Sequence, residues 1–233
     1  MNEEKAYSLC PLGDSAILIN FDNIINEGVN KKVLAFFNQI KQSALPGIRD
    51  IVPAYCSLAI HYDPLLVSNK HHTAFEYYSD QVTTILNSES EDVQNIYRMI
   101  RIPVCYSKKF GVDLNTISIA RKISVEEIIA LHSGKKYRIY MIGFLPGFAY
   151  MGEIDEKIRM PRLSQPRFKI EAGSVGIAGK QTGIYPVESP GGWQIIGRTP
   201  ISIFNNTSED PVLFQPGDEV QFYSITEDEF KNY

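Results

Sequence analysis

Residues 173–186 read Gly-Ser-Val-Gly-Ile-Ala-Gly-Lys-Gln-Thr-Gly-Ile-Tyr-Pro, a stretch in which short β-prone runs are separated by glycines. It belongs to a longer region, residues 143–217, which holds 11 of the 16 glycines and 8 of the 13 prolines in the 233-residue chain. No useful helical period is visible there, and short strands between turn signals are typical of a β-sandwich or barrel. We expect these strands at residues 174–178, 193–196, 201–204, 212–214 and 220–225.

The first hundred residues alternate strand patterns with helical ones. Apolar residues recur every three to four positions from Ile25 to Ile40 and from Phe75 to Ile85, which indicates two amphipathic helices. Short apolar runs that end at turn residues indicate strands. Strands interleaved with helices predict a small α/β domain with its helices packed on one sheet. The expected strands are residues 16–21, 48–52, 57–62 and 97–106.

Two short helices precede the β-rich half, and their ends carry capping signals. Asp113 is placed to cap the first helix, and Ser124 with Glu127 forms a capping box at the start of the second. Gly134 is placed for the left-handed turn that often follows a helix.

These patterns together predict an α+β protein with two domains. A small α/β sandwich domain is expected over residues 1–100, and a β-barrel domain, which includes the two leading helices, over residues 101–233. The boundary is expected between Asn95 and Asp113.

Composition excludes several classes of protein. The chain has a net charge of −4 and therefore lacks the excess of basic residues that is typical of a nucleic-acid-binding protein. The polar N-terminus has no signal-peptide pattern, and the longest uncharged run, residues 139–152, is shorter than the roughly 20 residues that a membrane span needs. Cys10, Cys56 and Cys105 are too few and too widely spaced for a disulfide framework, so we expect buried thiols. The chain is therefore predicted to be cytoplasmic, with neither nucleic acid nor membrane as a partner.

Familiar catalytic motifs are incomplete in this chain. The four histidines show no metal-binding spacing. Residues 173–181 resemble a Walker A loop, but five residues separate the outer glycines instead of four, and Gln181 replaces the Ser or Thr that would hold magnesium. We therefore reject a phosphate-binding loop of that class. Two interpretations stay open: the backbone N–H groups with Lys180 hold an anion, or the glycines only turn barrel strands.

Polar functional groups are concentrated between Arg159 and Arg198. Arg162 and Arg167 each follow a proline, and guanidinium groups suit carboxylate or phosphate ligands. Glu188 lies near Trp193, and an aromatic wall can desolvate a carboxylate and raise its pKa towards acid–base use. A Glu–Arg ion pair with Trp193 in the core explains the same residues equally well.

A set of ordered sequence blocks extends over the whole chain. They include Gly13-Asp14, Pro53-Ala-Tyr55, Ile102-Pro-Val-Cys-Tyr106, Gly143-Phe-Leu-Pro-Gly-Phe-Ala-Tyr-Met-Gly152, Pro161-Arg162, Pro166-Arg167, residues 172–179, residues 181–186, Glu188-Ser-Pro-Gly-Gly-Trp193 and Ile196-Gly-Arg-Thr-Pro200. Together they resemble the family of the bacterial 5-oxoprolinase B component (PxpB), also labelled allophanate hydrolase subunit 1, which includes the kinase inhibitor KipI.

The resemblance implies a cyclophilin-like topology for the barrel and an ATP-dependent opening of the lactam 5-oxoproline to glutamate. That activity would be shared with subunits A and C, with ATP as cofactor, Mg²⁺ as its counter-ion and no metal site in the protein. In this interpretation Glu188 and Gln181 are the catalytic candidates. Candidates for binding substrate or phosphate are Arg162, Arg167, Lys180, Tyr185, Trp193, Arg198 and His132, the last at a helix end whose dipole would favour its protonated form.

Two alternatives belong to other functional classes. One is a KipI-like module that inhibits a histidine kinase, with Phe144, Phe148, Tyr150 and Trp193 exposed as interface anchors. The other is a free-standing hydrolase, which ranks last because the sequence offers no self-contained nucleophile–base pair.

Overall fold

Two compact units, residues 1–96 and 97–233, make up the chain in the computed structural model, which describes residues 7–21, 26–67, 73–88 and 97–233. Each unit has its own apolar core. The architecture is α+β with a closed β-barrel, as the sequence predicts. Across the described residues, every helix is too short or too polar to cross a lipid bilayer.

An antiparallel sheet with strand order β1-β2-β4-β3 forms the first unit, together with two helices. Ile17 of β2 pairs with Ile60 of β4, and Ile19 with Leu58, so these side chains share one face of the sheet. The apolar sides of both helices pack on them and bury Val33 and other residues. The elements are β1 (Ser8–Pro11), β2 (Ala16–Asn20), α1 (Glu27–Ser43), β3 (Ile48–Pro53), β4 (Ser57–Tyr62), the 3₁₀ turn Pro64–Leu66 and α2 (Ala74–Asn87).

A seven-stranded closed barrel, in the order β10-β7-β6-β13-β5-β12-β9, forms the second unit. The first and last strands of the unit, β5 and β13, are parallel neighbours and pair from Met99↔Glu219 to Cys105↔Ile225. Strands β9 and β10 form the hairpin that closes the barrel. The barrel strands are β5 (Met99–Cys105), β6 (Lys136–Ile142), β7 (Ala149–Gly152), β9 (Ser174–Ala178), β10 (Gln181–Ile184), β12 (Gln194–Arg198) and β13 (Glu219–Ile225).

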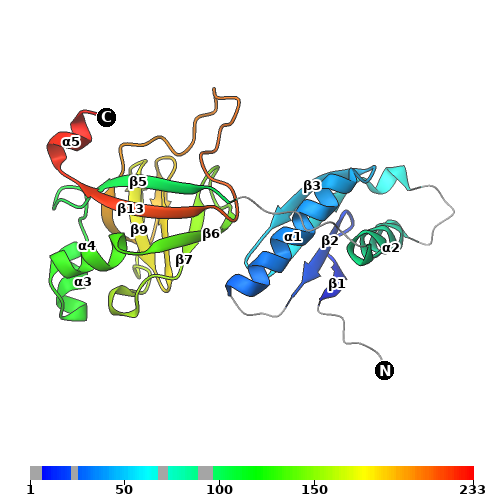
Figure 1. The fold of residues 1–233 in the computed structure, drawn as a ribbon, viewed down its shortest axis with the longest axis horizontal. Coiled ribbons are helices and arrows are strands. Elements are labelled where there is room, and N and C mark those ends of the chain that lie inside the picture. Colours follow the sequence, from blue (N-terminus) through cyan, green and yellow to red (C-terminus); the bar gives the residue numbers. More distant parts are fainter. Residues whose placement is uncertain (1–6, 22–25, 68–72, 89–96) are drawn as a thin grey trace. The chain divides into compact units, whose positions relative to one another are not determined.

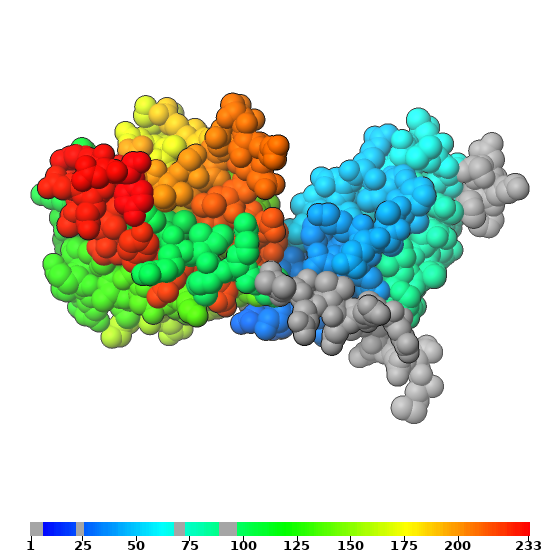
Figure 2. All heavy atoms as spheres, turned by 45° about the horizontal axis from the view of Figure 1, so that its top comes forward, coloured from blue at the N-terminus to red at the C-terminus, as the bar shows by residue number. Residues whose placement is uncertain are grey.

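Smaller elements surround the barrel. Helices α3 and α4 follow β5, a separate two-stranded sheet pairs β8 with β11, and the short helix α5 ends the chain (Figure 1). In Figure 2 the C-terminal residues, in red, lie on the outside of this unit. The bounds are α3 (Leu114–Arg121), α4 (Val125–Ser133), the 3₁₀ turn Glu156–Ile158, β8 (Arg167–Ile170), β11 (Ser189–Gly191) and α5 (Glu227–Lys231).

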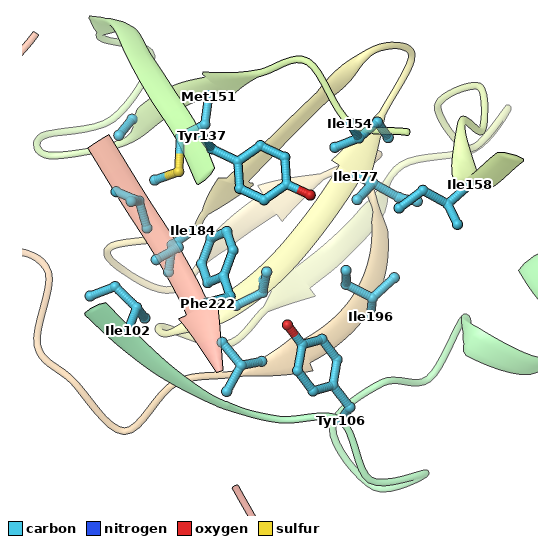
Figure 3. Close-up of a cluster of buried hydrophobic side chains, with 14 of the residues drawn as sticks. Ile102, Tyr106, Tyr137, Met151, Ile154, Ile158, Ile177, Ile184, Ile196 and Phe222 are labelled. Carbon is cyan, nitrogen blue, oxygen red and sulfur yellow. The ribbon is translucent and has the colours of Figure 1, made fainter. Parts of the chain in front are cut away.

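The barrel interior is filled with aliphatic side chains and a few aromatic rings. Figure 3 shows Tyr106, Tyr137 and Phe222 among isoleucines contributed by several strands. These residues are almost completely buried, and α4 covers part of the same core through Ile128. The interior is therefore a packed core, and any site for a ligand lies outside it.

Several sequence expectations fail at the level of detail. Residues 201–204 and 212–214 form no strand and make only the single bridge Phe204↔Val212. Gly134 ends α4 with φ −76°, not a left-handed φ, and it is needed because a Cβ would lie 2.7 Å from the carbonyl oxygen of Ala130. Ser124 accepts the Glu127 N–H at the start of α4 as expected, but the Glu127 carboxylate binds Nζ of Lys157 and does not complete the expected capping box. Cys10 and Cys56 are only half-buried, whereas Cys105 is buried as predicted.

Two glycines beside β9 allow a matched test of backbone strain. Gly173 has φ +82°, and a Cβ there would meet the Thr199 carbonyl oxygen at 2.4 Å; Gly179 has φ +57° with nothing within 4 Å. We expect Gly179→Ala to lower the free energy of unfolding by about 1–2 kcal/mol, the cost of a left-handed alanine. Gly173→Ala should cost about 2–5 kcal/mol, because overpacking adds to that strain.

The measurement is urea unfolding followed by the fluorescence of Trp193, the only tryptophan of the chain and a core residue of the second unit. Equal losses for the two variants would contradict the close approach of Gly173 to Thr199.

Candidate functional site

A groove of about 730 Å³ lies on the barrel unit. Its walls come from the segment before α3, strand β8, the ends of β9 and β12, and helix α5. Two of the predicted binding residues, Arg167 and Arg198, line it together. The remaining lining residues are Lys109, Phe110, Val112, Lys169, Ile170, Glu171, Ser174, Ile195, Glu227, Phe230 and Lys231.

Arg167 is held in place by a buried carboxylate. Its Nη2 donates to Oδ1 of Asp113 at 2.6 Å, and its Nη1 reaches the Trp193 carbonyl oxygen at 3.5 Å. Asp113 is 5% exposed, and its Oδ2 accepts the Ile195 backbone N–H at 2.6 Å. Asp113 therefore makes no side-chain cap on α3, contrary to the sequence expectation, because its carboxylate binds β12 and β8 instead.

Arg198 is placed by backbone and side-chain acceptors at the end of β12. Its Nε donates to the Ala172 carbonyl oxygen at 2.8 Å, and its Nη1 contacts the Glu171 carboxylate. The guanidinium carbon lies 5.9 Å from the centroid of the Phe110 ring, which packs against the Phe230 ring at 4.5 Å between centroids and a tilt of 32°. An arginine beside an aromatic wall is a common arrangement for holding an organic anion.

Glu188 lies at the margin of this region. Its Oε2 is 2.7 Å from Nζ of Lys169, which lines the groove, and this hydrogen bond raises the pKa of Lys169. The Glu188 side chain is 58% exposed, so the expected desolvation by Trp193 is wrong. An ion pair does form, but its cation is a lysine and not the arginine that the alternative interpretation named.

Trp193 and Tyr185 belong to a second apolar core. Both are almost fully buried with Phe148 and Ile170, and the Phe148 ring lies 5.4 Å from that of Trp193 and 5.3 Å from that of Tyr185. Burial raises the pKa of Tyr185. Of the aromatics expected to be exposed, Phe144 is exposed and Tyr150 is half-buried, whereas Phe148 and Trp193 are core residues.

His132 is fully buried inside the barrel, so it is neither protonated nor available to a ligand. Burial lowers its pKa to about 3, which overrides the expected effect of the helix dipole. Thr182 donates to the Gly176 carbonyl, so it accepts the His132 Nε2–H at 2.8 Å. The Tyr106 hydroxyl then donates to Nδ1, also at 2.8 Å. The imidazole is thus a satisfied core group.

Apart from Ser174, the glycine-rich hairpin lies outside the groove lining, and so does Arg162. Gly173 and Gly179 donate their N–H groups to the carbonyls of Tyr185 and Met160, which supports the interpretation that these glycines turn strands. Lys180 is exposed and lies 3.6 Å from Glu153, and Gln181 begins β10. Arg162 is exposed, and its charge opposes the burial that raises the pKa of Tyr150.

Sequence reasoning missed several residues of the groove. The pattern around Asp113 predicts only a helix cap, and Lys109, Lys169 and Phe230 belong to no motif. Lys169 carried a signal, since it follows Arg167 by two positions, the period that places side chains on one face of a strand. Within the described residues no cluster of His, Cys, Asp or Glu is suited to a metal ion.

Residues 7–214 match the family model described as carboxyltransferase domain, subdomain C and D. A curated protein of Bacillus subtilis (strain 168), named as the B component of 5-oxoprolinase, is 41% identical over 97% of this chain and 96% of its own length. An Escherichia coli O157:H7 protein of the same name is 31% identical over 91% of this chain and 93% of its own. These matches confirm the resemblance seen in the sequence.

A solved structure, that of TTHA0988, shares the fold with a TM-score of 0.78 and 33% identity over 90% of this chain. This chain covers 40% of the TTHA0988 chain, so the relative carries additional protein in the same polypeptide.

The buried imidazole leads to a prediction about pH. An unperturbed histidine has a pKa of about 6.5. The unfolded chain therefore binds a proton at His132 between about pH 6.5 and 3 that the folded barrel does not bind, so the free energy of unfolding falls as the pH falls through this range. We expect His132→Gln to remove up to about 1.4 kcal/mol per pH unit from this slope.

Urea unfolding monitored by Trp193 fluorescence at several pH values measures the slope. His61→Gln, a substitution in the first unit, is the matched control and should leave the slope of the barrel unchanged. The same slope in His132→Gln and in the unaltered protein would rule out a buried neutral imidazole.

Proposed function

Because the chain belongs to the family of carboxyltransferase domains, subdomains C and D, we propose that it is a subunit of an ATP-dependent amidase. More specifically, we propose that it is the B component of a 5-oxoprolinase, which opens 5-oxoproline to glutamate together with subunits A and C. The observation that carries this proposal is the similarity over nearly the full length to two curated proteins of that name.

The proposed reaction needs an activated amide. Transfer of the terminal phosphoryl group of ATP to the lactam oxygen releases ADP and makes the ring carbon more electrophilic. Water then adds to that carbon, the ring C–N bond breaks as the nitrogen is protonated, and a second water releases phosphate to leave glutamate. Such steps require cations that stabilise negative charge and a group that moves protons.

The part of the chain described by the structure supports a subunit that does not act alone. It gathers cationic side chains in one groove, which suits charge stabilisation. Its hydroxyl–imidazole contacts, from Thr182 and Tyr106 to His132, are buried and out of reach of a substrate. We therefore propose that groups from partner subunits complete the reaction.

Inhibition of a histidine kinase remains a prediction without an observation in its favour. Two of the four aromatics on which it rested, Phe148 and Trp193, are buried in the core and cannot anchor a partner.

Reconstitution tests the assignment. The chain is mixed with subunits A and C of the same organism, ATP, Mg²⁺ and 5-oxoproline, and the release of phosphate and glutamate is measured. We expect phosphate release that depends on 5-oxoproline and on all three proteins. If the full mixture turns over no 5-oxoproline while each subunit is folded, the assignment is wrong.

Glu188 is the proposed proton-transfer residue, and its exposed side chain, paired with Lys169 of the groove lining, is accessible to a partner or substrate. We expect Glu188→Gln to lower kcat of the reconstituted enzyme by about 100-fold or more, as loss of a general acid or base does. The pH profile of kcat should lose one limb. Glu126→Gln, at an exposed carboxylate of α4, is the matched control. Undiminished turnover would remove Glu188 from the mechanism.

A further inference from the structure

We propose that the groove between β8, β12 and α5 is a binding site for the oxyanion of an organic ligand, a carboxylate or a phosphate. The inference deepens the proposed function and rests on it for the identity of the ligand: the carboxylate of the lactam or the phosphates of ATP. The site itself rests on charge, hydrogen-bond geometry and the apolar wall of the groove.

The groove is cationic in a chain whose net charge is −4. Its lining contains five cationic side chains and two carboxylates, which are those of Glu171 and Glu227. Lys169 and Lys231 are paired with Glu188 and Asp228, which lie outside the lining, so the positive excess of the lining itself is what favours an anionic ligand. The cations are Lys109, Arg167, Lys169, Arg198 and Lys231.

Asp113 makes Arg167 a preorganised donor. A buried carboxylate is strongly destabilising without a partner, so the fold itself fixes the guanidinium of Arg167 against Asp113 Oδ1. The bonds to Asp113 and Trp193 engage Nη2 and Nη1, and within the described part of the chain Nε of Arg167 makes no hydrogen bond. Asp113 is thus a positioning residue, and Arg167 meets a ligand without reorganising.

Glu171 occupies the place that an anion would take on Arg198. Its carboxylate contacts Nη1 of Arg198 while its own side chain is 57% exposed. An exposed ion pair contributes little to stability, so a ligand oxyanion can displace Glu171 at small cost. Arg198 stays in position during this exchange, because its Nε remains bonded to the Ala172 carbonyl oxygen.

The apolar part of the lining favours an organic ligand over a bare ion. Phe230 of α5 packs against Phe110 with the rings tilted by 32°, and Val112, Ile170 and Ile195 add apolar surface to the lining. A ligand that carries an anionic group and an apolar or ring portion can contact both the cationic and the apolar side chains. Binding of the anion alone is therefore expected to be weaker than binding of the whole ligand.

Isothermal titration of the full-length chain with three probes tests the proposal: inorganic phosphate, ATP and 5-oxoproline. We expect ATP or 5-oxoproline to bind, and whichever binds more tightly identifies the source of the oxyanion. Arg198→Gln should weaken that binding about 10-fold or more, the effect of losing a charged hydrogen bond. Glu171→Gln should tighten it several-fold, because it removes the competing carboxylate.

Controls separate binding from folding. Arg49→Gln removes an exposed arginine in the first unit and should leave affinity unchanged. Arg167→Gln leaves Asp113 buried and unpaired, so its loss of affinity is compared with that of the Arg167→Gln/Asp113→Asn double variant, in which the stranded charge is absent. Each variant is accepted only when its Trp193 fluorescence matches that of the unaltered fold.

The proposal is overturned if none of the probes binds, or if Arg198→Gln and Glu171→Gln both leave affinity unchanged. These outcomes differ from failure of the proposed function. A reconstituted enzyme that turns over 5-oxoproline equally well with Arg198→Gln would retain the function and refute the groove. If the reconstituted mixture is inactive but probe binding changes in the Arg198→Gln and Glu171→Gln variants, the groove is supported and the proposed function is refuted.

Discussion

A single buried carboxylate, that of Asp113, ties together the elements from which the groove is built. Oδ2 of Asp113 accepts the Ile195 N–H of β12, and the backbone N–H of Asp113 donates to the Ile195 carbonyl oxygen. Oδ1 of Asp113 accepts a hydrogen bond from Arg167 of β8. A buried charge of this kind is tolerated only with close partners. The separate β8–β11 sheet is thereby anchored to the barrel at Arg167, which lines the groove, so the stability of this region and the proposed ligand binding involve the same contact.

Close backbone approaches set the second constraint on the barrel unit. A Cβ at Gly197 would lie 2.6 Å from Val104, and one at Gly111 would lie 2.4 Å from the Ile196 carbonyl oxygen. Glycine is therefore required where β12 meets β5 and the segment before α3. The glycines of the barrel unit thus permit close contacts between strands. The N–H groups of Gly173 and Gly179 donate to backbone carbonyls, and an anion bound there would have to replace these carbonyls.

Local signals in the sequence were sufficient for much of the fold. Short apolar or β-prone runs between turn signals predicted the strands 57–62 and 174–178 as observed, and the two amphipathic helices of the first unit lie where their periodicity places them. Expectations failed where tertiary contacts override local preference. Asp113 has the chemistry of a helix cap, but β12 and Arg167 are its partners, and neither is close to it in sequence.

For the candidate site too, local sequence signals predict some residues and tertiary contacts decide the others. Residue chemistry was enough to predict Arg167 and Arg198 as candidates for anion binding, and both line the groove, whereas burial decides which of the other candidates are accessible to a ligand. The local sequence around His132 and Trp193 does not indicate whether these polar or polarisable side chains are exposed. In the structure both are core residues. Conversely, Glu171 became significant only through its contact with Arg198, 27 positions away. An ion pair with an exposed carboxylate contributes little to stability. The contact between Glu171 and Arg198 is therefore the place where the proposed anion would have least to displace.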